Sequence, residues 1–269
     1  MPGRMRRPAR LAAALLALLV LAPAAGAANP APSWAKAEIA TVVGHGLMAP
    51  DAASFRPEDP LTRGELSELV TGLTGLPQRA PADPSATVTL AELDSRLVRA
   101  LGLQDAAAAF TTGARSAGLA PPGRFGTEVV ARLLGLRTNH PAAQDALELR
   151  PNDPVTRAET AYSAVRILRF RGGEAEAVRA AAAAFVLPEL TRWQRAILGK
   201  AFSFVGFPYV WGGESESRTG PYGPQAQGGF DCSGFVWRVY KLQAYAGAAA
   251  LAATLRGRTT FAMSAAAPA

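Results

Sequence analysis

An internal duplication constrains the fold of this chain more than any other sequence feature. The segment FRPEDPLTRGE at residues 55–65 returns as LRPNDPVTRAE at residues 149–159, and seven of the eleven positions are identical. Self-similarity of this kind is typical of a structural unit that packs against its own copies. The first part of the chain is therefore expected to be a repeat domain.

Each copy predicts the start of a helix. Thr62 and Thr156 are suitable N-caps, and Glu65 and Glu159 stand three residues later as capping-box partners. Apolar residues at helical spacing follow both caps: Leu66, Leu69, Val70 and Leu73 in the first copy, and Ala161, Val165 and Leu168 in the second. A degenerate third copy is expected at residues 88–101. Another helix is expected at residues 34–43, ended by the glycines at 44 and 46.

This order of helix, loop, Pro-x-Asp-Pro, Thr-Arg-x-Glu and helix resembles the S-layer homology repeat. Such repeats usually come in threes and form a helical pseudo-trimer that binds secondary cell-wall polysaccharide. The resemblance implies that Arg63 and Arg157 face this polysaccharide, and it gives Trp34 the place of the aromatic residue that opens a repeat. An equally good interpretation is that the two arginines are local clasps that order a loop.

The N-terminus predicts export. Residues 1–27 combine four arginines, an apolar run at 11–22 and small residues at 25–27, which is the pattern of a cleaved signal peptide. The alternative is a membrane anchor, but the run is shorter than the roughly 20 residues that span a bilayer. Cleavage would lower the net charge from +7 to +3 and leave no basic run with interleaved aromatics, so a nucleic-acid partner is not expected. We expect a secreted, wall-associated protein without a membrane anchor after cleavage.

A change in composition near residues 170–190 predicts a domain boundary. The sequence Arg-Gly-Gly at 171–173 ends the last repeat helix, and an alanine-rich stretch at 175–184 follows it. Thr191 and Gln194 then form a new helix start. The expected organisation is a repeat domain at 28–171, a connector at 172–190 and a second domain at 191–269.

Cys232 is the only cysteine, so it makes no internal disulfide and is either an inert buried thiol or a reactive one. A glycine-rich loop at 212–229 precedes it, and Asp231 stands where a helix cap belongs. In the first turn of a helix, free backbone N–H groups and the helix dipole favour an anion. This position favours the reactive thiolate over an inert thiol.

The surrounding pattern resembles the NlpC/p60 family of papain-like cell-wall cysteine peptidases. Its two halves are Pro-Tyr-Val-Trp-Gly-Gly at 208–213 and Phe-Asp-Cys-Ser-Gly-Phe at 230–235, and Arg-Gly-Arg-Thr-Thr at 256–260 is similar to the family's short Arg-Thr segment. The resemblance implies cleavage of stem-peptide amides in peptidoglycan, typically between D-glutamate and a diamino acid. It implies Cys232 as nucleophile, Tyr209 as hydroxyl donor near the oxyanion, and Asp231 and Ser233 at the amine end of the substrate. Trp211 either lines the substrate or packs in the core.

The catalytic histidine does not fit this pattern. A papain-like thiol needs a histidine as base, yet His45 and His140 both precede Cys232, and no alternating strand follows it. We expect a domain that is incomplete at its C-terminus; a degenerate inactive member and recruitment of His45 or His140 are the alternatives.

The expected fold class is therefore α+β, with a mostly helical repeat domain before the first part of a papain-like domain whose sheet is largely missing. The expected function is that of a wall-targeted peptidoglycan endopeptidase, inactive in this form and acting without a metal or other cofactor. A non-catalytic protein that binds wall polysaccharide is the alternative.

Overall fold

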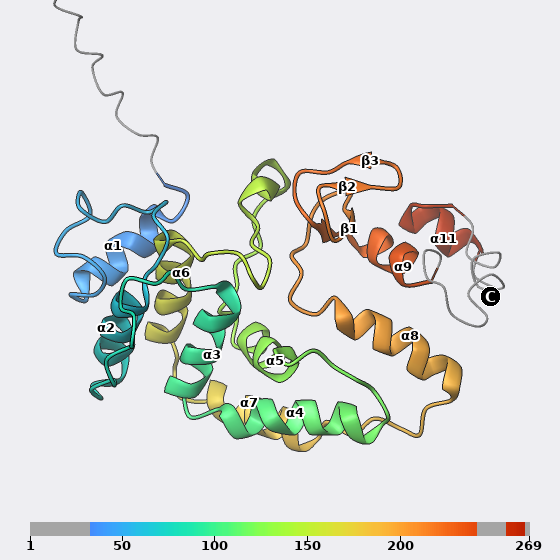
Figure 1. Ribbon diagram of the computed structural model, residues 1–269, viewed down its shortest axis with the longest axis horizontal. Coiled ribbons are helices and arrows are strands. Elements are labelled where there is room, and N and C mark those ends of the chain that lie inside the picture. The colour runs from blue at the N-terminus through green and yellow to red at the C-terminus, as the bar shows by residue number, and fades with distance from the viewer. Residues whose placement is uncertain (1–32, 241–256, 267–269) are drawn as a thin grey trace, which may run out of the picture. The chain divides into compact units, whose positions relative to one another are not determined.

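The computed structural model describes residues 33–240 and 257–266 (Figure 1). The predicted signal peptide at 1–27 and the alanine-rich tail at 244–253 lie outside the described residues. By their contacts, the described residues belong to one unit that begins at Ser33. No helix in this part of the chain is long and apolar enough to cross a membrane.

Helices dominate the structure. They are α1 (Lys36–Gly44), α2 (Arg63–Thr74), α3 (Leu90–Ala100), α4 (Gln104–Ser116), α5 (Phe125–Leu133), the 3-10 helix η1 (Ala142–Leu147), α6 (Arg157–Leu168), α7 (Glu174–Ala183), α8 (Arg192–Ser203), α9 (Cys232–Tyr240) and α11 (Thr260–Ala266). The strands are β1 (Glu214–Ser215), β2 (Thr219–Gly220), β3 (Gly223–Pro224) and β4 (Gly229–Phe230). The expected α+β class, mostly helical with little sheet, is confirmed.

Threonine caps begin α2, α3 and α6, as the repeat predicts. The hydroxyl oxygens of Thr62, Thr89 and Thr156 each accept a hydrogen bond from the backbone N–H three residues later. The degenerate third copy, at residues 88–101, is thus confirmed as a helix start. The full capping box predicted at Thr156 is wrong, because the Glu159 carboxylate bonds His140 instead of returning to the cap.

A closed ring of backbone hydrogen bonds joins the three copies just before these caps. The N–H of Leu61 donates to Val155 O, that of Val155 to Val88 O, and that of Val88 to Leu61 O, each at 2.9 Å. All three side chains are fully buried. We call these three residues the backbone ring; each copy supplies one donor and one acceptor, so all three are needed to close it.

The ring residues share one hydrophobic core with α2, α3, α4, α5 and α7. α1 lies against α6, while α4 packs on α5 and α7. Gly126 allows the close crossing of α5 and α4, since a Cβ there would stand 1.8 Å from the carbonyl oxygen of Ala107. Val178 and Ala182 of α7 are buried in the same core, so the alanine-rich stretch is a packed helix.

The C-terminal part begins at α8, where Thr191 and Gln194 form the predicted capping box. Helix α9 packs on α8 through a small apolar cluster of Ile197, Phe204, Phe230 and Val239. The stretch at 212–229, expected as a loop, contains two short antiparallel pairs, β1 with β4 and β2 with β3. The Gln225 side chain ties these pairs together by hydrogen bonds to the backbone of residues 214, 215, 227 and 229.

Candidate functional site

Cys232 is the first residue of α9, and its side chain is exposed. Asp231 caps the helix: its Oδ1 accepts hydrogen bonds from Gly234 N at 2.5 Å and from Ser233 Oγ at 3.0 Å. A Cβ on Gly234 would stand 1.9 Å from Gly213 O, so this position admits no side chain. The start of α9 therefore packs closely against the turn at residues 212–213, and the thiol is exposed at the N-terminal end of the helix.

Two residues from the segment at 257–260 complete this helix start. Thr260 Oγ1 lies 3.3 Å from Cys232 Sγ. Arg258 donates from Nη1 to Ser233 Oγ at 2.7 Å and from Nε to Glu214 Oε2 at 2.9 Å, and lies 3.5 Å from Asp231 Oδ1. The sequence drew attention to this segment only through its resemblance to the family's Arg-Thr motif; its contacts with the thiol and the cap were not foreseen.

Tyr209 lines the same pocket as Cys232, a cavity of about 410 Å³. The main chain brings the two together, because Tyr209 bridges Phe230, two residues before the thiol. Partial burial, followed by negative charge at Cys232 and Asp231, raises the pKa of the Tyr209 phenol. The phenol thus keeps its proton at neutral pH and is able to donate a hydrogen bond.

Trp211 is 70% exposed, which excludes the core-packing interpretation. Its backbone N–H donates to Asp145 Oδ2 at 2.7 Å, so the carboxylate on η1 holds the turn after Tyr209. Asp145 itself is buried, and its Oδ1 has no hydrogen-bond partner. Nothing in the sequence around Asp145 signals this role, since η1 carries no motif.

Neither histidine lines the pocket that holds Cys232. His140 is buried, and its Nε2 lies 2.6 Å from Glu159 Oε1, while its ring packs edge-on against Trp34 at 4.5 Å. Burial lowers the pKa of His140, but the bond to Glu159 and the charge of that carboxylate outweigh it and raise the pKa above its ordinary value. His45 is exposed at the end of α1.

The two arginines of the repeat motif lie in different surroundings. Arg157 is 3% exposed; its guanidinium pairs with Glu65, bonds the carbonyl oxygens of Met48 and Phe55, and lies over the Phe55 ring. Arg63 is exposed and pairs with Glu92 at 2.8 Å. The contacts of Arg157 agree with the clasp interpretation, in which it orders the loop at 48–55.

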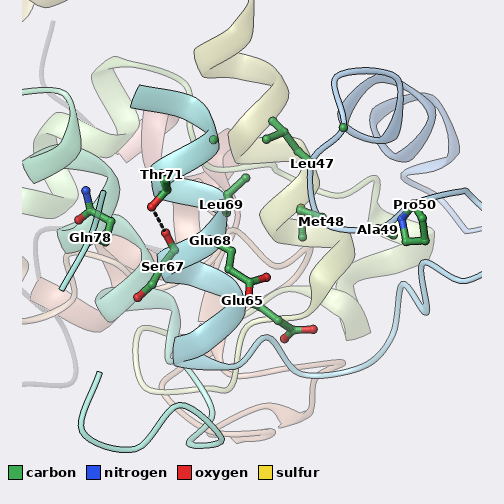
Figure 2. Close-up of a pocket in the computed structure, with 12 residues that line it drawn as sticks. Leu47, Met48, Ala49, Pro50, Glu65, Ser67, Glu68, Leu69, Thr71 and Gln78 are labelled. Carbon is green, nitrogen blue, oxygen red and sulfur yellow. Dashed lines mark hydrogen bonds between the residues drawn. The ribbon is translucent and has the colours of Figure 1, made fainter. Parts of the chain in front are cut away.

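A pocket of about 640 Å³ in the repeat region lies between the loop at 46–50 and α2. Figure 2 shows the side chains of Glu65 and Glu68 extending from α2 toward the segment that carries Met48 and Pro50. None of Arg63, Arg157 and Trp34 lines this pocket. Within the described ranges, no group of three or more histidine, cysteine or acidic side chains is placed to hold a metal ion.

Two family models match the chain. The S-layer homology domain matches residues 28–67, and the NlpC/P60 family matches residues 206–249. No curated protein and no solved structure matches. The chain thus joins an S-layer homology segment to a partial NlpC/P60 segment, which indicates a protein of a peptidase family that is associated with the cell surface or wall.

Proposed function

We propose that this chain is a secreted, wall-targeted thiol hydrolase in which Cys232 attacks amide bonds of peptidoglycan stem peptides. The observation that carries this proposal is the exposed Sγ at the first residue of α9, in one pocket with Tyr209. A nine-residue helix with a capped start directs free N–H groups toward this end. These groups favour both the thiolate and the oxyanion that its attack creates.

In the proposed reaction, the thiolate forms an S–C bond with the substrate carbonyl, and the carbonyl oxygen becomes an oxyanion. The Tyr209 hydroxyl and the N–H groups of α9 stabilise that charge. The C–N bond then breaks as the amine takes a proton, and water later hydrolyses the thioester. Asp231 and Ser233 hold the amine end of the peptide, and the exposed Trp211 ring packs on it.

The proton transfers of a papain-like thiol need a histidine, which the described pocket does not contain. Its lining includes Cys232, Tyr209 and Asp231 but no histidine. A thiol without an imidazole partner still reacts with strong electrophiles, whereas amide hydrolysis requires protonation of the leaving amine. We therefore expect covalent labelling of Cys232 without turnover.

Wall attachment is the proposed role of the repeat region, taken as residues 28–171 with a connector at 172–190 before the thiol domain at 191–269. Exposed Arg63 and half-buried Trp34 are proposed to meet the polysaccharide. Arg157 supports this surface from within by ordering the loop at 48–55. Residues 1–27 are proposed to export the chain.

A non-catalytic wall-binding protein is the second candidate function, and the lack of a histidine in the thiol pocket favours it. In that case the repeats carry the whole function and the thiol region has no substrate. Reactivity at Cys232 separates the two candidates.

The test uses purified residues 28–269 with Cys232→Ser as the control. We expect iodoacetamide to label Cys232, the protein to sediment with purified wall, and chromatography to detect no soluble peptide fragments. A thiol that stays unlabelled in the native state, but not after unfolding, would contradict the proposed nucleophile. Release of fragments that depends on Cys232 would contradict the missing base.

A further inference from the structure

We propose that Asp145, in the repeat region, is a positioning residue for the thiol site and fixes the turn that follows Tyr209. This inference rests on the proposed function, in which the Tyr209 hydroxyl stabilises an oxyanion, and adds to it a contribution from the repeat region. Asp145 belongs to η1, and its Oδ2 accepts the Trp211 N–H at 2.7 Å. A side chain outside the thiol region thus bonds the main chain of the thiol site.

Trp211 lies in a tight turn in which its N–H has no partner inside the turn. The N–H of Gly213 donates to Val210 O at 2.9 Å, and Gly212 has a φ of 72°, which together are the geometry of a type II turn. The bond that closes such a turn joins its first and fourth residues. The N–H of the second residue, here Trp211, therefore needs an acceptor from outside, and Asp145 supplies it.

The other side of this turn is bonded to the strand that leads into Cys232. Backbone hydrogen bonds run from Val210 N to Phe230 O at 3.2 Å and from Phe230 N to Pro208 O at 3.1 Å. Tyr209 stands between these two bonds, and Phe230 is two residues before Cys232. The turn is therefore tied to the thiol on one side and to η1 on the other.

Other side chains of the repeat region bind the segment that leads into Tyr209. Arg124 donates to Val205 O at 2.9 Å. Arg132, on α5, donates to Phe207 O at 3.4 Å. The Tyr209 side chain is 38% exposed, so its ring has limited packing and its place depends mainly on the main chain that carries it. The repeat region thus holds this main chain both before and after Tyr209.

The 3-10 helix that carries Asp145 is itself attached at its end. Buried Gln227 donates from Nε2 to the carbonyl oxygen of Glu148, the residue after η1, at 3.2 Å. Glu148 Oε1 accepts the His140 N–H at 2.5 Å. The Asp145 carboxylate is therefore ordered before a substrate binds, which lowers the entropy cost of ordering the site.

The burial of Asp145 also favours a role in the site. Asp145 is 4% exposed, and among the described residues its Oδ1 has no hydrogen-bond partner. A buried carboxylate oxygen without a partner weakens a fold, and such groups are typical of functional sites. Burial, then negative charge at Cys232, Asp231 and Asp145, raises the pKa of the Tyr209 phenol. The carboxylate thus helps to keep the phenol protonated as well as in place.

The experiment uses N-acetylglycinal, an aldehyde that reacts reversibly with a thiolate. The Cys232 sulfur forms an S–C bond with the carbonyl carbon, and the carbonyl oxygen takes the negative charge and then a proton from water. The dissociation constant is measured on the purified chain as protection of Cys232 from iodoacetamide, relative to each variant's own alkylation rate without aldehyde. We expect Tyr209→Phe to raise this constant roughly tenfold and Asp145→Ala to raise it roughly three- to tenfold.

Three further variants distinguish positioning from a general structural role. Because Asp145 acts through Tyr209, adding Asp145→Ala to Tyr209→Phe should raise the constant by less than about twofold more. Asp145→Asn should bind the aldehyde as the wild type does, since its amide oxygen accepts the same N–H. Asp145→Glu displaces the carboxylate and should behave like Asp145→Ala, and it gives the answer if the alanine variant does not fold.

Asp105→Ala is the matched control, because it removes an exposed carboxylate of α4 that does not line the thiol pocket. Its constant should equal that of the wild type. A wild-type constant in Asp145→Ala or Asp145→Glu, additive losses in the double variant, or an equal rise in Asp105→Ala would overturn the inference and leave the nucleophile intact. If Tyr209→Phe binds the aldehyde as the wild type does, or native Cys232 resists iodoacetamide, the proposed function itself fails.

Discussion

The three copies of the repeat unit share one cap and differ in the cation that meets its glutamate. Arg157 reaches Glu65 from a buried position, and Arg63 reaches Glu92 at the surface. The middle copy has Leu90 where the others have arginine, and the glutamate left over, Glu159, is met by His140. The same local sequence thus yields a buried clasp, a solvated pair and a titratable contact, and burial decides what each contributes to stability.

The buried clasp should give the largest effect. Arg157→Ala removes the guanidinium that holds Glu65 and two carbonyl oxygens, and we expect a loss of about 3 kcal/mol in the free energy of unfolding. Urea denaturation followed by circular dichroism measures it. Arg157→Lys retains the charge but not the planar set of guanidinium N–H donors, and it should recover only part of the lost free energy of unfolding. A loss under about 1 kcal/mol would remove the difference between the copies.

The contact between His140 and Glu159 should have the second-largest effect on the free energy of unfolding. Of the three contacts, it alone should depend on pH near neutrality. The pKa of His140 is raised in the folded protein, so its contribution is full below the ordinary value and is lost as pH rises through the folded pKa. Burial raises the pKa of neighbouring Glu148 to about 7, and ionising that carboxyl also weakens the fold as pH rises. Glu159 and Glu148 are the acids that face the ring, and Asp145 acts on Glu148.

His140→Gln should therefore cost about 2 kcal/mol at pH 6 and less at pH 8, because it removes a hydrogen bond to a charged group. Denaturation at both pH values measures this difference, with the exposed His45→Gln as the control. Equal losses at the two pH values would show that the contact between His140 and Glu159 stabilises the fold equally well with a neutral imidazole.

The surface pair should give the smallest effect. Arg63→Ala removes an ion pair whose arginine side chain is 43% exposed, and exposed pairs contribute about 0–1 kcal/mol. The same denaturation assay should show a change near its detection limit, and high salt should remove it. If Arg63→Ala destabilised the protein as much as Arg157→Ala, the copies would be equivalent despite their different burial.

Local sequence patterns predicted much of this fold. Thr62, Thr89 and Thr156 marked three helix starts because a cap and its N–H partner lie within four residues of each other. Asp231 and Cys232 were placed at the start of α9 for the same reason. Such interactions are visible to sequence reasoning because both partners stand in one short window.

Long-range partners could not be predicted in this way. His140 takes up Glu159 from a segment that shares no motif with the repeat, and Asp145 reaches Trp211 across 66 residues. Arg132 sits on α5 with the spacing of an ordinary exposed ion pair to Glu128. It lines the pocket of Cys232 because α5 contacts the segment at 202–207, through the stacking of Phe125 on Phe202 and the contact of Arg132 with Phe207 O.

The backbone ring has a consequence for how such a protein can evolve. In an open array of repeats, units can be added or removed at an end, since each touches only its neighbours. Leu61, Val88 and Val155 instead use every donor and acceptor of the ring among themselves. A fourth copy would find no unpaired backbone donor or acceptor in the ring. The loss of one copy would leave buried backbone groups without a hydrogen-bond partner. Selection should therefore remove variants in which unequal recombination has changed the number of copies. Sequence drift inside a fixed set of three, as at Leu90, is the change this architecture tolerates.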